Sequence, residues 1–205
     1  MLKFRIGNCR VCISGSFFAL ITFILLVSDS EIVLISLFSS FLHEAGHIFA
    51  MWVLGYGIKQ LTFTAVGIRL DKSESIAASY TDEIIVSIAG FAVNALLCLL
   101  FFSVYVYTGI VFARNIAIVN LLVGIFNLLP VESLDGARTL YYILLKRMTP
   151  ERADRVILYS SLVTVLLLIS SVFFLFRMNG GNLSFVIATV YMMFILINHI
   201  IELKK

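Results

Sequence analysis

The chain has 205 residues, of which 61% are hydrophobic and only 13% are charged. Soluble domains carry about 25% charged residues, so this composition excludes an ordinary soluble protein and is typical of a polytopic membrane protein. The net charge of +3 at pH 7 is small and gives no reason to expect nucleic acid as a partner. Three cysteines are too few for a disulfide-stabilised scaffold.

Six apolar segments are long enough to cross a hydrocarbon core of about 30 Å, and they lie at residues 11–27, 32–54, 84–107, 113–129, 156–176 and 183–201. The first follows a basic stretch, as a secretory signal core does, but it is longer than such a core and lacks a small-residue cleavage site. We therefore expect this helix to be retained. The predicted fold is a single all-α polytopic membrane domain with six transmembrane helices over residues 1–205.

The distribution of Lys and Arg predicts the orientation in the membrane. If the N-terminus is cytoplasmic, only Arg114 and Arg177 of the 15 Lys and Arg residues lie on the outer side. Because these residue types collect on the cytoplasmic side, both termini of this cell-membrane protein are predicted to be cytoplasmic. The basic loop at residues 141–155 is predicted to contact anionic lipid headgroups.

The second segment contains the sequence His-Glu-Ala-Gly-His at residues 43–47. On a helix, His43 and His47 lie one turn apart on the same face, so both imidazoles can reach one ion. Imidazole is a favoured zinc ligand, and this spacing places Glu44 beside the metal, where it can take a proton from zinc-bound water. The alternative is a chance pattern on a buried helix. Three ionisable groups in lipid are costly unless they are paired or functional, which favours a metal site.

A second group of candidate residues follows the fourth segment, at residues 127–138. Pro130 interrupts helical hydrogen bonding and Gly136 permits a sharp turn, so Asp135 is expected on irregular backbone near membrane depth. Such backbone survives there only when it is buried in protein or lines a wet cavity. Asp135 is therefore a candidate third zinc ligand, which leaves the fourth position for water. The alternative is an ordinary cytoplasmic turn, since Asp-Gly is a common turn pair; the two histidines favour the ligand.

Two further regions predict local structure around this site. Residues 61–71 are rich in β-branched and aromatic residues, which predicts a small β-hairpin or edge strand between the second and third helices; a solvated connector is the alternative. An exposed edge strand could hold an extended peptide substrate. In the third segment, Ser87, Gly90 and Asn94 share one face, where the small residues allow close helix packing. Asn94 either bonds to a neighbouring helix or faces the metal cavity.

Two motifs, HEAGH at residues 43–47 and NLLPVESLDGAR at residues 127–138, together resemble those of the site-2 protease family of intramembrane zinc metalloproteases. The short six-helix layout with an active site towards the cytoplasm resembles the stage IV sporulation protein FB branch. The resemblance covers residues 32–138, the expected catalytic core. It implies that His43, His47 and Asp135 bind one zinc ion per chain, with Glu44 as general base. The remaining pattern residues of the family fall on Gly90, Asn94, Asn127, Pro130 and Gly136.

The sequence departs from the family pattern at Ser133 and Ala137, where family members often have proline and glycine. Neither change removes a ligand, although both bear on the shape of the cavity. No stretch is long enough for a PDZ domain, and no nucleotide-sensing CBS domain is expected.

The predicted function is that of an intramembrane zinc metalloendopeptidase, which cleaves a membrane-associated protein substrate with zinc-activated water. Asn94, Asn127 and Pro130 are the candidate substrate or oxyanion residues. The alternative is a zinc-binding membrane scaffold or transporter, which explains the ligands but gives Glu44 no task. The expected partners are the protein substrate and the lipid bilayer, and the sequence leaves a homo-oligomer open.

Overall fold

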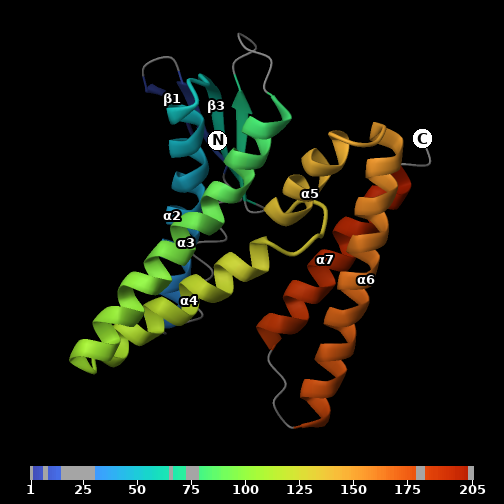
Figure 1. Cartoon of the computed structure of the whole chain (residues 1–205). Coiled ribbons are helices and arrows are strands. Elements are labelled where there is room, and N and C mark those ends of the chain that lie inside the picture. The colour runs from blue at the N-terminus through green and yellow to red at the C-terminus, as the bar shows by residue number, and fades with distance from the viewer. Residues whose placement is uncertain are drawn as a thin grey trace. The chain divides into compact units, whose positions relative to one another are not determined.

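The computed structural model describes residues 2–6, 9–14, 31–64, 67–72, 79–178 and 183–202. The chain divides into two compact units, Met1–Gly124 and Ile125–Lys205. Figure 1 labels the helices and strands of both units. The first unit contains a sheet, two long helices and most of a third helix, and the second contains the end of that helix followed by three more.

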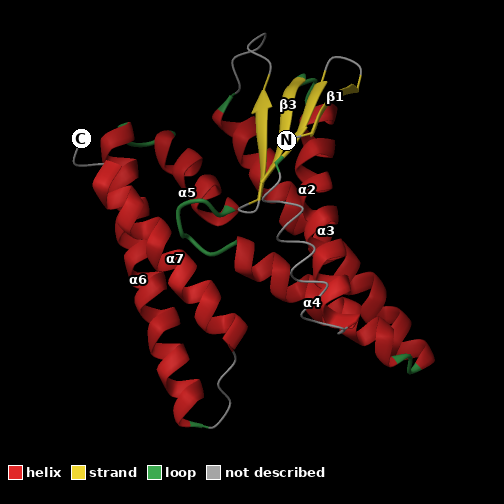
Figure 2. Cartoon of the chain, turned by 180° about the vertical axis from the view of Figure 1, so that it is seen from behind, coloured by secondary structure: helices red, strands yellow, loops and turns green. Residues whose placement is uncertain are grey.

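One four-stranded sheet belongs to the first unit, in the order β1 (Leu2–Ile6), β2 (Cys9–Ile13), β3 (Ile58–Thr64) and β4 (Gly67–Lys72). The β1–β2 and β3–β4 pairs are antiparallel, whereas β2 pairs with β3 in parallel. Figure 2 shows the strands in yellow, gathered at one end of the first unit's long helices. The hairpin predicted after the second helix is confirmed. The strand β3 has a partner on each side, so β1 and β4 are the sheet edges within the described residues.

The prediction for the N-terminal region is wrong in two respects. The first predicted span, at residues 11–27, begins within β2, and the predicted small hairpin is part of a four-stranded sheet to which the unpredicted β1 and β2 also belong. Apolar and basic residues alternate along Leu2–Ile6, which is the period of a strand, but Lys and Arg before an apolar segment also resemble the flank of a membrane helix. Residues 15–27 of this predicted span lie outside the described residues.

Two helices of the first unit, α2 (Glu31–Val53) and α3 (Tyr80–Thr108), pack along one another. Their backbones approach closely at Gly46 of α2. A Cβ atom there would lie 2.8 Å from Cγ2 of Val93 and 2.9 Å from the carbonyl oxygen of Ala89. Small residues of this kind allow membrane helices to pack closely, and here they bring the histidine-bearing face of α2 against α3.

Hydrogen bonds join the end of α2 to the start of α3. The helix α2 is followed by Gly55 in the left-handed region (φ 78°), and the next residue, Tyr56, donates its hydroxyl hydrogen to Oδ2 of Asp82 at 2.6 Å. The same carboxylate oxygen accepts from the backbone N–H of Ser79 at 3.3 Å, as part of the capping box that begins α3. The hydrogen bond to Asp82 raises the pKa of Tyr56 above its ordinary value of 10.0.

The helix α4 (Val111–Asn127) belongs to the first unit as far as Gly124. The second unit then contains three helices, namely α5 (Asp135–Leu145), α6 (Pro150–Arg177) and α7 (Leu183–Glu202). Its apolar core consists of Val131, Val165, Met192 and Leu196. The helix α5 is not among the predicted elements, and its residues 141–145 lie in the predicted basic loop, because a helix of 11 residues is too short to be recognised as a membrane span.

Among the described helices, α2, α3 and α6 are long and apolar enough to cross a membrane, and α4 is a shorter apolar helix. Large apolar side chains on them, such as Phe49, Trp52 and Leu99, are exposed in the isolated chain. Together these features indicate a multi-pass membrane protein. The segments predicted from residue 32 onward coincide with α2, α3, α4, α6 and α7, although the helix ends differ by a few residues. A membrane crossing by all of them stays a prediction.

Candidate metal centre

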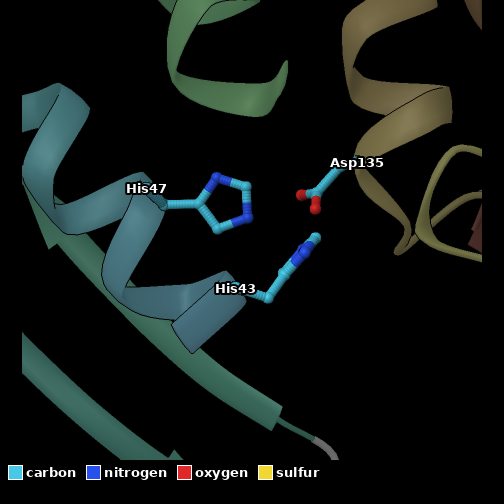
Figure 3. Close-up of side chains that lie close together, drawn as sticks. All are labelled: His43, His47 and Asp135. Carbon is cyan, nitrogen blue, oxygen red and sulfur yellow. The ribbon is translucent and has the colours of Figure 1, made fainter. Parts of the chain in front are cut away.

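Two buried imidazoles lie on one face of α2. His43 and His47 are 3% and 5% exposed, and their rings stand edge to face with centroids 4.8 Å apart. Figure 3 shows both rings projecting from the same side of the helix. The four-residue spacing therefore has the consequence that the sequence predicts, since one helical turn brings the two rings together.

The protonation of His47 follows from its hydrogen bond to α3. Nδ1 of His47 lies 2.7 Å from the backbone carbonyl oxygen of Val86. A carbonyl oxygen can only accept, so Nδ1 carries the proton and donates. In the neutral ring the lone pair then belongs to Nε2, which is the form that binds a metal ion.

His43 reaches the same tautomer through a side-chain amide. Its Nδ1 lies 3.0 Å from Oδ1 of Asn94, which is 0% exposed. The amide nitrogen of Asn94 in turn lies 3.5 Å from the backbone oxygen of Asn120 and 3.4 Å from its Oδ1. Because those oxygens accept, the Asn94 nitrogen faces Asn120 and the Asn94 oxygen faces His43. The Nδ1 atom of His43 therefore donates, and its lone pair also belongs to Nε2.

Both lone pairs face the one position on α3 that has no side chain. A Cβ atom on Gly90 would lie 2.6 Å from Nε2 of His43 and 2.6 Å from Nε2 of His47. Two imidazole nitrogens beside one small space can supply two of the ligands of a zinc ion, since zinc binds imidazole nitrogen at about 2.0–2.1 Å. A methyl group at position 90 would fill that space. The residues present on α2 and α3 therefore fit a metal ion.

Glu44 follows His43 directly on α2 and is half-buried. It is thus held on a rigid helix next to the two candidate ligands, as the predicted role of a general base requires. Gly46, in the same motif, supplies the close approach to α3 described above.

The second unit carries the remaining predicted site residues. Asn127 ends α4, and the irregular segment 128–134 leads to Asp135, the first residue of α5, where Figure 3 draws its carboxylate. Carboxylates at a helix N-terminus are stabilised by the helix dipole. Ser133 has a left-handed backbone (φ 74°), which a proline cannot adopt, so the departure from the family pattern at this position has a structural reason. Asn127 and Asp135 are both half-buried.

Hydroxyl groups of α6 hold the segment that precedes Asp135. Ser161, fully buried, donates to the carbonyl oxygen of Pro130 at 3.1 Å and accepts from the N–H of Glu132 at 3.1 Å. Ser160 also lies within hydrogen-bond distance of the Pro130 carbonyl, at 3.2 Å. The predicted site residue Pro130 therefore contributes through its backbone oxygen to the anchoring of the segment on α6.

By the chemistry of their donors, His43, His47 and Asp135 could bind a metal ion. Sequence reasoning missed several residues that orient them. Asn120 could have been identified from the sequence, because an asparagine in an apolar span is costly unless its side chain is hydrogen-bonded. The Val86 carbonyl could not have been identified, since every residue has a backbone carbonyl. Ser161 could not have been either, because nothing in the sequence distinguishes it from the other hydroxyl residues of α6.

Comparisons with known proteins extend this description. Residues 108–168 match the family model described as Peptidase family M50. The match includes Asn127, Pro130 and Asp135, but it covers less than half of the chain. Among solved structures, the chain is similar to the Site-2 Protease from Methanocaldococcus jannaschii, with a TM-score of 0.66, 19% sequence identity, and coverage of 97% of this chain and 94% of that chain. At this identity the likeness shows a common fold. A comparison with curated protein sequences found no match.

Proposed function

We propose that this protein is an intramembrane zinc metalloprotease of the site-2 protease type, which cleaves a membrane-associated protein substrate. The observation that carries the proposal is the pair of buried imidazoles on α2, each bonded through Nδ1 and each with Nε2 beside Gly90. The M50 match over residues 108–168 and the site-2 protease fold support the same class.

In this proposal His43, His47 and Asp135 are the ligands of one zinc ion per chain. When bound, zinc would supply Lewis acidity, which polarises a carbonyl group and lowers the pKa of water to about 7. The imidazole tautomers described above prepare Nε2 of both histidines for this role, because a ring nitrogen must be unprotonated to bind a metal.

In this proposal Glu44 accepts the proton of the attacking water and later donates it to the leaving amine. Asn127 is the candidate donor to the oxygen of the scissile carbonyl, on which negative charge develops. A helical substrate must unwind first, since its carbonyl groups are bonded within the helix. The edge strand β4 (Gly67–Lys72) could hold the unwound segment by strand pairing.

We further propose that six helices cross the membrane, with both termini and the active site towards the cytoplasm. The stage IV sporulation protein FB branch is the proposed relationship within the family, and it rests on the six-helix layout, on the position of the active site and on the motifs.

The test of the proposal compares the wild type with Glu44→Gln. The variant is expected to keep its zinc, measured by elemental analysis of the purified protein, and to lose peptide cleavage by a factor of about 100 or more. Cleavage is measured by mass spectrometry of membrane proteins from cells that contain either form. Fragments present with both forms at equal levels would refute the role of Glu44. Zinc transport into liposomes without any cleavage would instead favour a transporter.

A further inference from the structure

A chain of buried hydrogen bonds connects α4 to the ring of His43, within the first unit. The amide nitrogen of Asn120 donates to the carbonyl oxygen of Ile116 at 2.9 Å, so its Oδ1 is turned towards Asn94. The two oxygens of Asn120 accept from the Asn94 amide nitrogen, and Oδ1 of Asn94 accepts from His43. Asn120 is 1% exposed and Asn94 is 0% exposed, so water does not compete for these groups.

We propose that Asn120 is a positioning residue that selects the metal-binding tautomer of His43 by orienting the amide of Asn94. This inference rests on the proposed metal centre. An asparagine amide can face His43 with either end. With its oxygen towards the ring, Nδ1 must donate and Nε2 keeps the lone pair; with its nitrogen towards the ring, Nδ1 must accept and the proton moves to Nε2, where it blocks metal binding.

Asn120 decides between these two states because it offers Asn94 only acceptors. Its side-chain nitrogen is engaged by Ile116, and the two atoms that it presents to Asn94 are both oxygens. A reversed Asn94 amide would place its oxygen against the oxygens of Asn120 and lose the bonds to them, which is unfavourable in a buried site. The proton on His43 is thereby determined by a residue on a third helix.

The other histidine provides an internal contrast. His47 is bonded to the backbone carbonyl of Val86, which cannot be reversed. A change at Asn120 should therefore alter His43 and leave His47 in place. The inference also gives Asn94 a positioning role, since both ends of its amide are in use, and leaves Asn127 as the candidate oxyanion donor.

The first measurement uses the full-length, metal-free protein in detergent micelles with ¹⁵N-labelled histidine. The chain has only three histidines, so the spectrum can be assigned with single substitutions. In the wild type we expect the Nδ1–H tautomer for both His43 and His47. In Asn120→Leu, His43 should become a mixture of tautomers while His47 is unchanged. Loss of helix packing alone would lower the melting temperature without moving the His43 signals, and unchanged His43 signals would overturn the proposal.

The second measurement is zinc affinity, by competition with a chromophoric chelator. Asn120→Leu and Asn94→Leu should each weaken zinc binding by about 10–100-fold, the usual effect of losing a group that orients a ligand. The double variant should bind no more weakly than the Asn94 variant, because the two residues act through one bond. Asn120→Asp keeps an acceptor towards Asn94 and, with its carboxyl protonated, a donor to the Ile116 carbonyl, so it should weaken zinc binding less than Asn120→Leu. If the leucine variant does not fold, Asn120→Ala removes the same acceptor.

The matched control is Asn115→Leu, the same substitution five residues earlier on α4, at a half-buried residue. It should leave zinc affinity and the His43 tautomer unchanged. Additive losses in the double variant, or a loss in Asn115→Leu equal to that in Asn120→Leu, would overturn the proposal. The two ideas fail separately: a wild type that binds no zinc refutes the proposed function, whereas a wild type that binds zinc as well as Asn120→Leu does refutes only the role of Asn120.

Discussion

The two units present their candidate ligands in different ways. In the first, His43 and His47 stand on a regular helix, and hydrogen bonds only have to orient their rings. In the second, Asp135 begins a helix after an irregular segment that includes the left-handed Ser133, and α6 holds that segment through Ser161. A ligand on a helix is thus fixed by spacing and ring orientation, whereas a ligand after a loop depends on the path of the backbone.

The candidate ligands of each unit also depend on one glycine, and the atoms next to the two glycines differ in kind. The missing Cβ of Gly90 leaves space beside imidazole side chains, which can move. The missing Cβ of Gly136 leaves space for the backbone carbonyl of Leu128, which can move only if the whole segment does. Substitution should therefore damage metal binding in the first case and folding in the second.

The largest expected effect is that of Gly136→Ala. A Cβ atom at this position would overlap the Leu128 carbonyl, so the segment that carries Pro130 must be displaced. We expect a loss of about 3 kcal/mol or more in the free energy of unfolding, at the upper end of overpacking effects. Denaturant unfolding of the purified protein measures it. A variant as stable as the wild type would show that the backbone near Asp135 is adaptable, and the contrast between the two units would fail.

The second effect concerns the glycine of the first unit. Gly90→Ala should lower zinc affinity by about 100-fold, because the methyl group occupies the space beside both Nε2 atoms, while the protein still folds. Competition titration with a chelator measures the affinity. The control is Gly124→Ala, whose Cβ would have atoms of Phe91 at 3.2 Å and Cβ of Asn94 at 3.3 Å as its nearest neighbours, rather than imidazole nitrogens. Equal zinc affinity in Gly90→Ala and the wild type would show that the metal does not bind in the space beside Gly90.

The third effect concerns the anchoring of the second unit's loop. Ser161→Ala removes the acceptor of the Glu132 N–H and one donor to the Pro130 carbonyl, and should cost about 1–2 kcal/mol. Ser171→Ala, on the same helix, removes only a bond to the Leu167 carbonyl at an exposed position and should cost much less. Thermal unfolding of both variants measures the difference. Equal losses would mean that α6 does not hold the loop through this hydroxyl.

The same contrast explains what the sequence could predict. The histidine pair follows from helical spacing, which is local and periodic, so the face that carries His43 and His47 was predictable. Proline restricts backbone angles, and the break at Pro130 correctly predicted irregular backbone after α4. The prediction went wrong at Asp135 and Gly136, which were expected on that irregular backbone and in a turn but form the first residues of α5.

Other features depend on contacts between distant segments, which a single sequence does not encode locally. The parallel pairing of β2 with β3 joins strands about 50 residues apart, and the bond from Asn94 to Asn120 joins two helices. The positive φ of Ser133 had no signal, since serine is not the residue that usually adopts it. The sequence therefore predicts which residues are candidates, and the packing decides how they are oriented.

The smallest expected effect tests whether the helix pair beside the histidines is also held by hydrogen bonds. Tyr56→Phe removes the bond to Asp82 and should lower the melting temperature by about 2 °C at pH 7. The pKa of Tyr56 is raised by that bond, so the protonated phenol is the stabilised form; its contribution is complete below pH 10 and is lost as the pH rises through the raised pKa. The gap in melting temperature between wild type and variant should therefore close as the pH rises above 10 and through the raised pKa of Tyr56. A gap that persists unchanged at high pH would show that Tyr56 acts through packing with Met51 and Val86 instead.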